Sequence, residues 1–390
     1  MSFDVAVGMS GAELNTTSAA VYHALYPKVF TGTWPGEFEG NNFTIGVDVA
    51  APPVFDLSGV TGQTFTLSLP AVALTLTNGV TTKLTIALTA RCQVLSQAGK
   101  VSFVPQDVTA APLSDPVTNY LVQHVVLPAV KNMLTQLLSG VSIPPIQVAN
   151  IPLSAPAVGV TNGYVIATVS LASGPAPSPP DGSFPWPGTP FFALLGPALI
   201  QQLAVEATQS ATNRFSAGGS GGSGWAGYSW SYGLSLTNPR SSIQGSGAQL
   251  QFTLSGGVSA GFTLMWVPIS LAFNAYAAPD PTANASITIA GNQLVMTATS
   301  VNPFTIYVLP GSVPTWIFGW LVTAVINAVV LSLTPLVTTF LKNIQLDSYQ
   351  VPTYSVTVDG TTLTLTPVNL TISSAGGMIA LTGNAAISHN

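Results

Sequence analysis

Side chains that could bind a metal are few in this 390-residue chain. Its three histidines are His23, His124 and His389. None shows the H-x-x-x-H or H-E-x-x-H spacing that puts two ligands on one face of a helix. The single cysteine, Cys92, shares an alternating apolar register with Leu84 to Val94, which indicates a core position on a strand. We therefore predict no metal site and no disulfide within the chain.

Residues that could act as catalytic groups also lack the context that catalysis needs. Ser220 and Ser259 stand in the letters G-x-S-x-G, which mark a nucleophile when a strand precedes the serine and a helix follows it. Ser220 lies in a Gly/Ser stretch after a predicted helix, and Ser259 precedes a further predicted strand. Glu37 and Glu39 lie beside Trp34-Pro35-Gly36, which indicates a solvated turn rather than a glycosidase carboxylate pair. We predict no catalytic residue, no cofactor and no enzymatic activity.

The composition excludes several classes of partner. Only 5% of the residues are charged, against roughly 25% in an ordinary soluble domain. The 8 basic residues are scattered and the net charge is −5, so no basic stripe exists to neutralise nucleic-acid phosphates or anionic lipid. The first residues show no basic region followed by an apolar one, so we expect no classical signal peptide. The expected location is the cytoplasm, or the exterior by a non-classical route.

A proline-rich stretch divides the chain into two halves with a similar order of elements. Residues 173–190 contain seven prolines, so we predict a linker there, between a first repeat at 1–172 and a second at 191–390. The first half reads as a helix at 11–26, several strands with alternating apolar residues, a helix at 117–138, and strands at 143–153 and 157–171. The second half reads as a helix at 191–215, a Gly/Ser loop from Ala217, several strands, a helix at 316–340 and terminal strands. Such alternation is typical of antiparallel sheets with one buried face.

The spacing of prolines shows how the two halves align with each other. Pro128 precedes Pro145 by 17 positions, and Pro335 precedes Pro352 by 17, with an offset of 207 between the two pairs. A further offset matches residues 162–171 with residues 376–385. We therefore predict that the chain arose from two copies of one fold.

The stretch 316–340 has 25 residues without a charge, which is long enough to cross a bilayer. On a helical wheel, however, it has an apolar seam and a polar side, as does the helix at 117–138. The matching first-half helix carries His124 and Lys131 and is a poor membrane span, which favours two helices that face their sheets. Because the second helix is apolar on most sides, one of its faces could line a hydrophobic site. We predict the following ligand-binding residues along the two seams: Val122, Val126, Val130, Met133, Leu137, Phe318, Val322, Val325, Val329, Leu336 and Phe340.

Two short stretches carry a resemblance to a known family. Ile143–Ile146, which reads IPPI, and the Asn162-Gly163-Tyr164 turn resemble the tubular lipid-binding (TULIP) superfamily, whose members include the BPI-like proteins. Phe3-Asp4-Val5, followed by a helix bearing Asn15, is similar to the bacterial OrfX-type branch. The resemblance implies an α+β fold of two TULIP-like repeats in an elongated tandem arrangement. In each repeat a highly curved antiparallel sheet would wrap around a long apolar helix.

The resemblance also implies a function. Family members bind lipids or other hydrophobic molecules in an elongated apolar groove, so we expect a lipid-like ligand in this chain. In the clostridial OrfX setting such proteins are encoded beside toxin components, which implies a protein partner in a toxin-like or secreted complex. A structural or assembly protein without a ligand is the alternative, and transient membrane contact is a third possibility. The absence of a basic tip argues against lipopolysaccharide binding.

Overall fold

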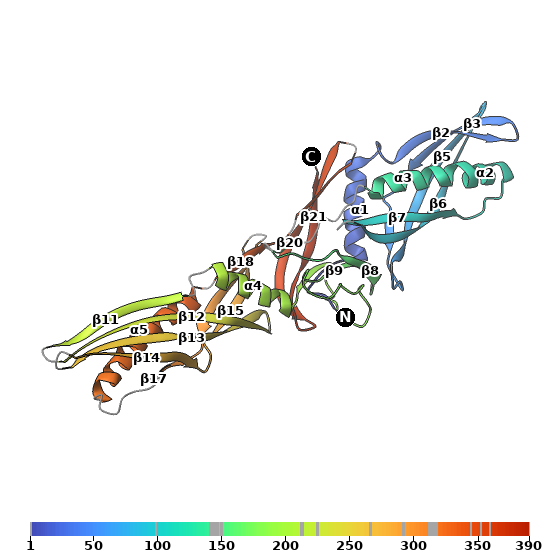
Figure 1. Cartoon of the computed structure of the whole chain (residues 1–390). Helices are drawn as coiled ribbons and strands as arrows, with labels where there is room; N and C mark the ends of the chain where they lie inside the picture. Colours follow the sequence, from blue (N-terminus) through green and yellow to red (C-terminus); the bar gives the residue numbers. More distant parts are fainter. Residues whose placement is uncertain are drawn as a thin grey trace. The chain divides into compact units, whose positions relative to one another are not determined.

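The structure is a computed structural model, and it describes residues 2–97, 100–139, 148, 151–210, 214–223, 226–264, 267–290, 293–310, 319–343, 345–351, 353–358 and 360–389. It divides into two compact units. Unit 1 contains Met1–Gly196 together with Gln350–Asn390, and unit 2 contains Pro197–Tyr349. Both are built mainly from antiparallel strands with a small number of helices, which makes the fold α+β (Figure 1).

Unit 1 contains a curved six-stranded sheet whose order is β2-β3-β5-β6-β7, with β4 paired to β5. Its strands are β2 (Thr31–Phe38), β3 (Asn41–Val49), β4 (Val54–Asp56), β5 (Thr64–Asn78), β6 (Val80–Gln97) and β7 (Lys100–Ala110). Pairing shifts register between Leu69 and Val72 of β5 and between Arg91 and Cys92 of β6, and such bulges bend a sheet. Side chains alternate between the two faces along each strand, so in β3 Ile45, Val47 and Val49 are all buried on the inner face.

A long helical segment covers that inner face. It consists of α2 (Pro116–Leu121), a π-helical turn η1 (Val122–Val126) and α3 (Leu127–Ser139). Asp115 caps its first turn by accepting from the Thr118 amide at 2.7 Å. The prediction of a helix at 117–138 is therefore confirmed.

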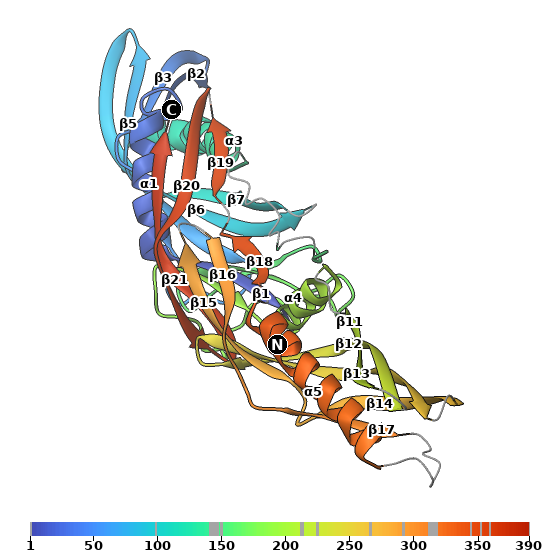
Figure 2. The ribbon, with the colours of Figure 1, turned by 90° about the vertical axis from the view of Figure 1, so that its left-hand side faces the viewer.

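A second, seven-stranded sheet in unit 1 brings both ends of the chain together. Its order is β19-β20-β21-β10-β1-β9-β8. The strands are β1 (Val5–Ser10), β8 (Ala157–Thr161), β9 (Tyr164–Val169), β10 (Phe191–Leu195), β19 (Tyr354–Val358), β20 (Thr361–Ala375) and β21 (Met378–His389). Helix α1 (Gly11–Leu25) follows β1 and lies along β20 and β21 (Figures 1 and 2). At its first turn the buried carboxylate of Glu13 accepts from the Ala385 amide at 2.6 Å, which joins helix and sheet.

The pairing at the centre of this sheet is symmetric. In the antiparallel pair β1–β10, Val5 lies opposite Leu195, Val7 opposite Ala193 and Met9 opposite Phe191. The flanking pairs correspond as well, because β9 pairs β1 as β21 pairs β10. The two hairpins β8–β9 and β20–β21 thus lie outside the two central strands in equivalent positions.

Among its described residues, unit 2 contains an eight-stranded sheet and two helices. The path is β11-β12-β13-β15-β16-β18, with β14 paired to β13 and β17. Its strands are β11 (Arg214–Ser223), β12 (Ala226–Gln244), β13 (Gly247–Leu264), β14 (Val267–Ala278), β15 (Thr282–Ala290), β16 (Gln293–Val301), β17 (Thr305–Pro310) and β18 (Gln345–Gln350). The helices are α4 (Pro197–Ser210) and α5 (Gly319–Lys342), and α5 packs across β11, β12 and β15–β17.

Several predicted elements differ from the structure. The predicted helix 191–215 is in fact strand β10, the shorter helix α4 and the beginning of strand β11. The predicted Gly/Ser loop from Ala217 is part of β11, whose residues pair without interruption with residues 226–235 of β12. The predicted turn at Glu37 is wrong, since Glu37 pairs with Asn42 within β2–β3 and only Glu39 lies in the turn. The strand predicted at 143–153 falls mostly outside the described residues.

The stretch 173–190 has no regular strand or helix, but it is bound closely to unit 1 rather than spanning freely between two halves. Trp186 stacks on Phe3 and Phe192 with ring centroids 5.7 and 5.8 Å away. Its indole Nε1 donates to the Asp181 carbonyl at 2.8 Å, and the Thr168 hydroxyl donates to the Ser178 carbonyl at 2.8 Å. The predicted boundaries at 172 and 191 are therefore not those of the compact units, and the C-terminal strands belong with the N-terminal ones.

Candidate hydrophobic ligand site

An apolar pocket opens between α1 and the curved sheet of unit 1. Its volume is about 80 Å³. The helix α1 contributes Leu14, Thr17, Ser18 and Val21, the loop before β4 contributes Pro53, the strands contribute Phe55, Leu67 and Phe103, and α3 contributes Leu138. The wall is almost entirely hydrocarbon, because the Ser18 hydroxyl already donates to the Pro53 carbonyl at 2.6 Å. We call this site the α1 pocket.

Hydrogen bonds from α1 hold the rim of the α1 pocket in place. The Asn15 side chain donates from Nδ2 to the Phe55 carbonyl at 3.0 Å and accepts from the Phe55 amide at 2.6 Å, as a neighbouring strand would. The Tyr22 hydroxyl donates to the Val49 carbonyl at 2.9 Å. Burial of Tyr22, with the nearby Tyr26 and Asp48, raises the pKa of its hydroxyl, which therefore stays a donor at neutral pH. The short strand β4 is thus attached to α1 by hydrogen bonds from helix side chains to its backbone.

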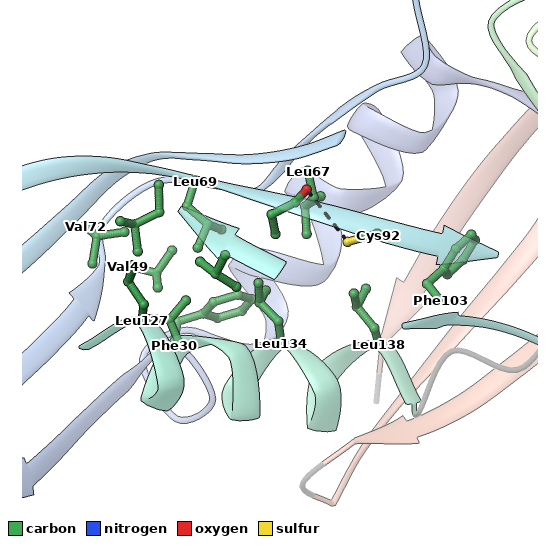
Figure 3. Packing of buried hydrophobic residues seen from close by; sticks show 14 of the residues in the cluster. Phe30, Val49, Leu67, Leu69, Val72, Cys92, Phe103, Leu127, Leu134 and Leu138 are labelled. Atoms are coloured by element: carbon green, nitrogen blue, oxygen red, sulfur yellow. Dashed lines mark hydrogen bonds between the residues drawn. The ribbon is translucent and has the colours of Figure 1, made fainter. Parts of the chain in front are cut away.

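The helix α3 forms the floor of the pocket and of the surrounding core. A row of fully or almost fully buried residues runs along η1 and α3: Val122, Val126, Val130, Leu134 and Leu138. Leu134 and Leu138 point from α3 toward β5, where Leu67 and Leu69 lie (Figure 3). These residues are spaced by four, so they form one ridge that is inclined to the helix axis.

The predicted first seam and the buried row of this helix share three residues and differ after Val130. Val122, Val126 and Val130 are all 0% exposed, but the row continues through Leu134 rather than Met133, which is only half-buried. The side chain of Leu137 lies outside the described residues. Val122, Val126, Val130 and Met133 do not line the α1 pocket, and the described α3 residue that does is Leu138.

The helix α5 shows the same arrangement in unit 2. Its fully buried row is Val325, Val329, Leu333, Val337 and Leu341. Of the predicted second seam, Val325 and Val329 belong to this row, Val322 and Phe340 are half-buried, and Leu336 is 44% exposed. Phe340 contacts Phe215 of β11 edge to face, with ring centroids 5.6 Å apart. Phe318 lies outside the described residues.

Among the described residues, one helix is long and apolar enough to cross a membrane by length and composition, and it is this segment, Val322–Lys342. Its buried row packs on the sheet of unit 2, and 28% of its apolar window is buried in the structure. Leu331, at 74% exposed, lies on the side of the helix away from that row.

The residues that could act as nucleophiles or metal ligands lie in positions that do not favour such chemistry. Cys92 is fully buried, and burial raises the pKa of its thiol to about 12. Ser220 and Ser259 lie within strands β11 and β13, which rules out the strand–turn–helix context of a nucleophile elbow. The His124 ring packs on the ring of Tyr120 at 4.2 Å. Across the part of the chain that the structure describes, no group of three or more His, Cys, Asp or Glu residues could hold a metal ion.

Sequence reasoning missed the α1 pocket because it assigned the ligand to the two longest apolar helices. The available signal was in the helix at 11–26, where Leu14 and Val21 are seven positions apart and so share a face. That face is weakly apolar, and only the tertiary structure brings it against Phe55 and Phe103.

Comparisons with known proteins show a likeness in fold. No protein-family model matches the chain, and no curated protein matches it by sequence. Two solved structures of P47 from Clostridium botulinum align over nearly the whole chain. The E1 protein has 10% identity, coverage of 98% of both chains and a TM-score of 0.54, and the A2 protein has 12% identity, coverage of 98% and 97%, and a TM-score of 0.53. A lipopolysaccharide binding protein aligns over 99% of both chains with a TM-score of 0.32, which is too low to carry an argument.

Proposed function

We propose that this chain is a non-enzymatic protein that binds a lipid or another hydrophobic small molecule, and that an aliphatic part of the ligand occupies the α1 pocket. The observation that carries the proposal is the apolar wall made by Leu14, Val21, Phe55, Phe103 and Leu138. A cavity with such a wall does not hold ordered water, so entry of hydrocarbon is favourable. The resemblance to the tubular lipid-binding superfamily implies the same class of ligand.

The size of the α1 pocket limits what it can take. A volume of about 80 Å³ accepts a few methylene groups, since one liquid water occupies roughly 30 Å³. The remainder of a lipid would lie outside the pocket. We therefore expect single-chain amphiphiles such as fatty acids to bind by the end of their alkyl chain. Their affinity should then depend on how well that end fits the pocket and not on the head group.

Ligand-dependent thermal stability tests this proposal. We expect solvent extraction of the purified protein, followed by mass spectrometry, to release a lipid-like molecule. A fatty acid added at about 100 times its dissociation constant should stabilise the fold by about 2.7 kcal/mol, which raises Tm by about 5–10 °C for a unit of this size. If extraction yields no lipid and no fatty acid or phospholipid shifts Tm, the α1 pocket is not a ligand site.

A matched pair of substitutions locates the site. Val21→Phe places a larger side chain into the α1 pocket, whereas Val125→Phe enlarges another half-buried valine that packs on the same core away from the pocket. We expect Val21→Phe to abolish the ligand-dependent shift in Tm and Val125→Phe to keep it. Equal shifts in the two variants would place the ligand elsewhere.

We also propose that the chain consists of two copies of one fold, each with a sheet curved around a helix. The buried rows support this, because Val122, Val126, Val130 and Leu134 lie 207 positions before Val329, Leu333, Val337 and Leu341. The symmetric pairing of β1 with β10 supports it independently. So does the fifth residue of each first helix, since Gln201 of α4 bonds the backbone of Pro239 and Ser241 as Asn15 of α1 bonds Phe55.

A structural or assembly protein without a ligand is the second candidate. The observation that favours it is the burial of the two helix rows, since residues at 0% exposure contact protein on all sides. The interior would then be core, and the small α1 pocket a packing defect. Cross-linking in a native lysate distinguishes the two, because a stoichiometric protein partner together with an empty pocket supports assembly alone.

A further inference from the structure

Strand β11 forms one edge of the sheet in unit 2 and differs from the other edge strands. It is 10 residues long and reads RFSAGGSGGS, with neither a proline nor a charge after its first residue. The other edges are blunted in the usual ways, by charges or prolines or by shortness. Prolines or charges occur in β2 (Pro35, Glu37), β7 (Lys100, Pro105, Asp107), β17 (Pro310) and β18 (Asp347), and β8 and β19 have five residues each.

The free side of β11 is accessible. Within the described part of the chain, Phe215–Ser223 makes no backbone hydrogen bond besides its pairing with β12. Ser216, Ala217, Gly218, Gly219 and Ser220 are all exposed, whereas residues of a strand paired on both sides alternate between buried and exposed. An edge of this length carries a row of unused amide and carbonyl groups that can pair with another strand.

Aromatic rings order this strand despite its glycines. A Cβ added at Gly219 would lie 2.9 Å from Cζ2 of Trp230, so that ring lies flat over the backbone of β11. The Tyr228 ring covers Gly221 in the same way. Such rings offset the cost of glycine in a strand. Because Tyr228 and Trp230 are only half-buried, both retain surface that an added strand could contact.

We propose that β11 is the interface through which two copies of this chain associate, with the two β11 strands paired antiparallel about a twofold axis. A foreign peptide is recognised by side-chain pockets beside the edge, and a strand of glycine, serine and alanine offers none. A second β11 meets only glycine, alanine and serine along residues 216–220, so the middle of the pair packs without a clash, and Arg214 and Phe215 lie at its two ends. About ten hydrogen bonds would form along the pair.

Charge favours the antiparallel arrangement. The only charged residue of β11 is Arg214, at its first position. In an antiparallel pair the two copies of this residue lie at opposite ends, about 30 Å apart, which is several times the screening length at physiological salt. A parallel pair would put them side by side. The pairing is self-complementary, as a twofold interface must be.

Analytical ultracentrifugation of the full chain tests the proposal. We expect the mass to rise with concentration from 40.0 kDa toward twice that value. The double variant Ser216→Lys with Ser220→Lys should raise the dimer dissociation constant by about tenfold or more, since like charges then face each other across the pair. The matched control is Ser229→Lys with Ser231→Lys, which adds the same charge to the same face of the sheet one strand further in, and it should dimerise almost normally.

Cross-linking gives a second readout that does not depend on stability. Cys92 is buried, so a cysteine introduced on β11 is the only accessible thiol. We expect single variants at Ser216, Gly218 and Ser220 to include one that forms a disulfide-linked dimer, and Ser229→Cys to form none. A chain that stays monomeric at all concentrations would overturn the proposal, as would a dimer that the β11 lysines do not weaken.

Discussion

At the scale of single residues, Cys92 shows how burial removes reactivity. Its thiol lies on the inner face of β6 with 0% exposure, and burial raises its pKa to about 12. Thiolate is the reactive form, so we expect the native protein to resist a maleimide at pH 8 while the urea-unfolded chain reacts rapidly. Equal rates of alkylation in the two states would show that the β5–β6 region opens easily.

The same shift predicts a pH dependence of stability. The folded-state pKa lies above the unfolded value, so this contribution is fully present below about pH 9 and is lost as pH rises toward 12. The free energy of unfolding should fall by at most about 1.4 kcal/mol per pH unit in that window. Urea titrations of the wild type and of Cys92→Ala at pH 8 and pH 10.5 measure it, and the fall should be smaller in the variant, where the raised pKa of Tyr22 still contributes.

Asn15 is the residue on which the rim of the α1 pocket depends most directly. Asn15→Ala leaves the amide and carbonyl of Phe55 without partners, and we expect a loss of about 1–3 kcal/mol in the free energy of unfolding. Thr16→Ala is the control, because its exposed hydroxyl only donates to Ala12 within the same helix. That control should change stability by less than about 0.5 kcal/mol. A loss for Asn15→Ala no larger than that of the control would mean that the two hydrogen bonds to Phe55 make no net contribution to stability.

At the scale of elements, the row of buried residues on α5 differs from the apolar seam predicted from the sequence, and mutations can distinguish the two. Leu333 belongs to the observed row at 0% exposure, whereas Leu336 belongs to the seam predicted from the sequence and is 44% exposed. We expect Leu333→Ala to cost about 2–5 kcal/mol and Leu336→Ala much less, because only the first leaves a cavity. Chemical denaturation of the two variants measures the difference. A larger effect at Leu336 would mean that its side chain is buried against a partner or ligand in solution.

The two long helices were predictable from the sequence. The residues that each helix buries were predictable only in part. The predicted seams used an average helical period, which suits a helix parallel to its neighbours. The buried rows instead follow residues spaced by four, so they differ from the predicted seams after Val130 and after Val329. Which row is buried depends on how each helix lies on its sheet, and the sequence contains no direct record of that orientation. For the same reason it did not identify Leu138 as a wall of the α1 pocket.

Glycine and proline account for the other errors at this scale. Gly-rich β11 was predicted as a loop because glycine disfavours strands, and the rings of Tyr228 and Trp230 that stabilise it come from the neighbouring strand. The prolines of residues 173–190 correctly excluded regular structure. They did not reveal that Phe184 and Trp186 hold this stretch against Phe3 and Phe192. In both cases a contact distant in sequence decides the outcome.

At the scale of the whole molecule, the antiparallel α+β class and the order of most elements follow from alternation and helical periodicity. The division into units does not, because β10 and β21 pair only after the chain has passed through all of unit 2. The proline-rich stretch places the start of the proposed second repeat at residue 191. Compactness places residues 191–196 and 350–390 with residues 1–190, so the proposed repeats and the compact units are different divisions of one chain.

This difference gives the last prediction. β21 contributes Ile379, Ala380 and Leu381, all 0% exposed, and pairs along the whole of β10. A chain that ends at Tyr349 loses this strand, and each fully buried aliphatic side chain contributes about 1.5–3 kcal/mol. We expect amide hydrogen exchange to show lost protection in β1, β9 and β10, while β12 and β13 of unit 2 keep theirs. Unchanged protection in β1 and β10 would mean that residues 1–172 fold as an independent repeat, as the proline pattern alone indicates.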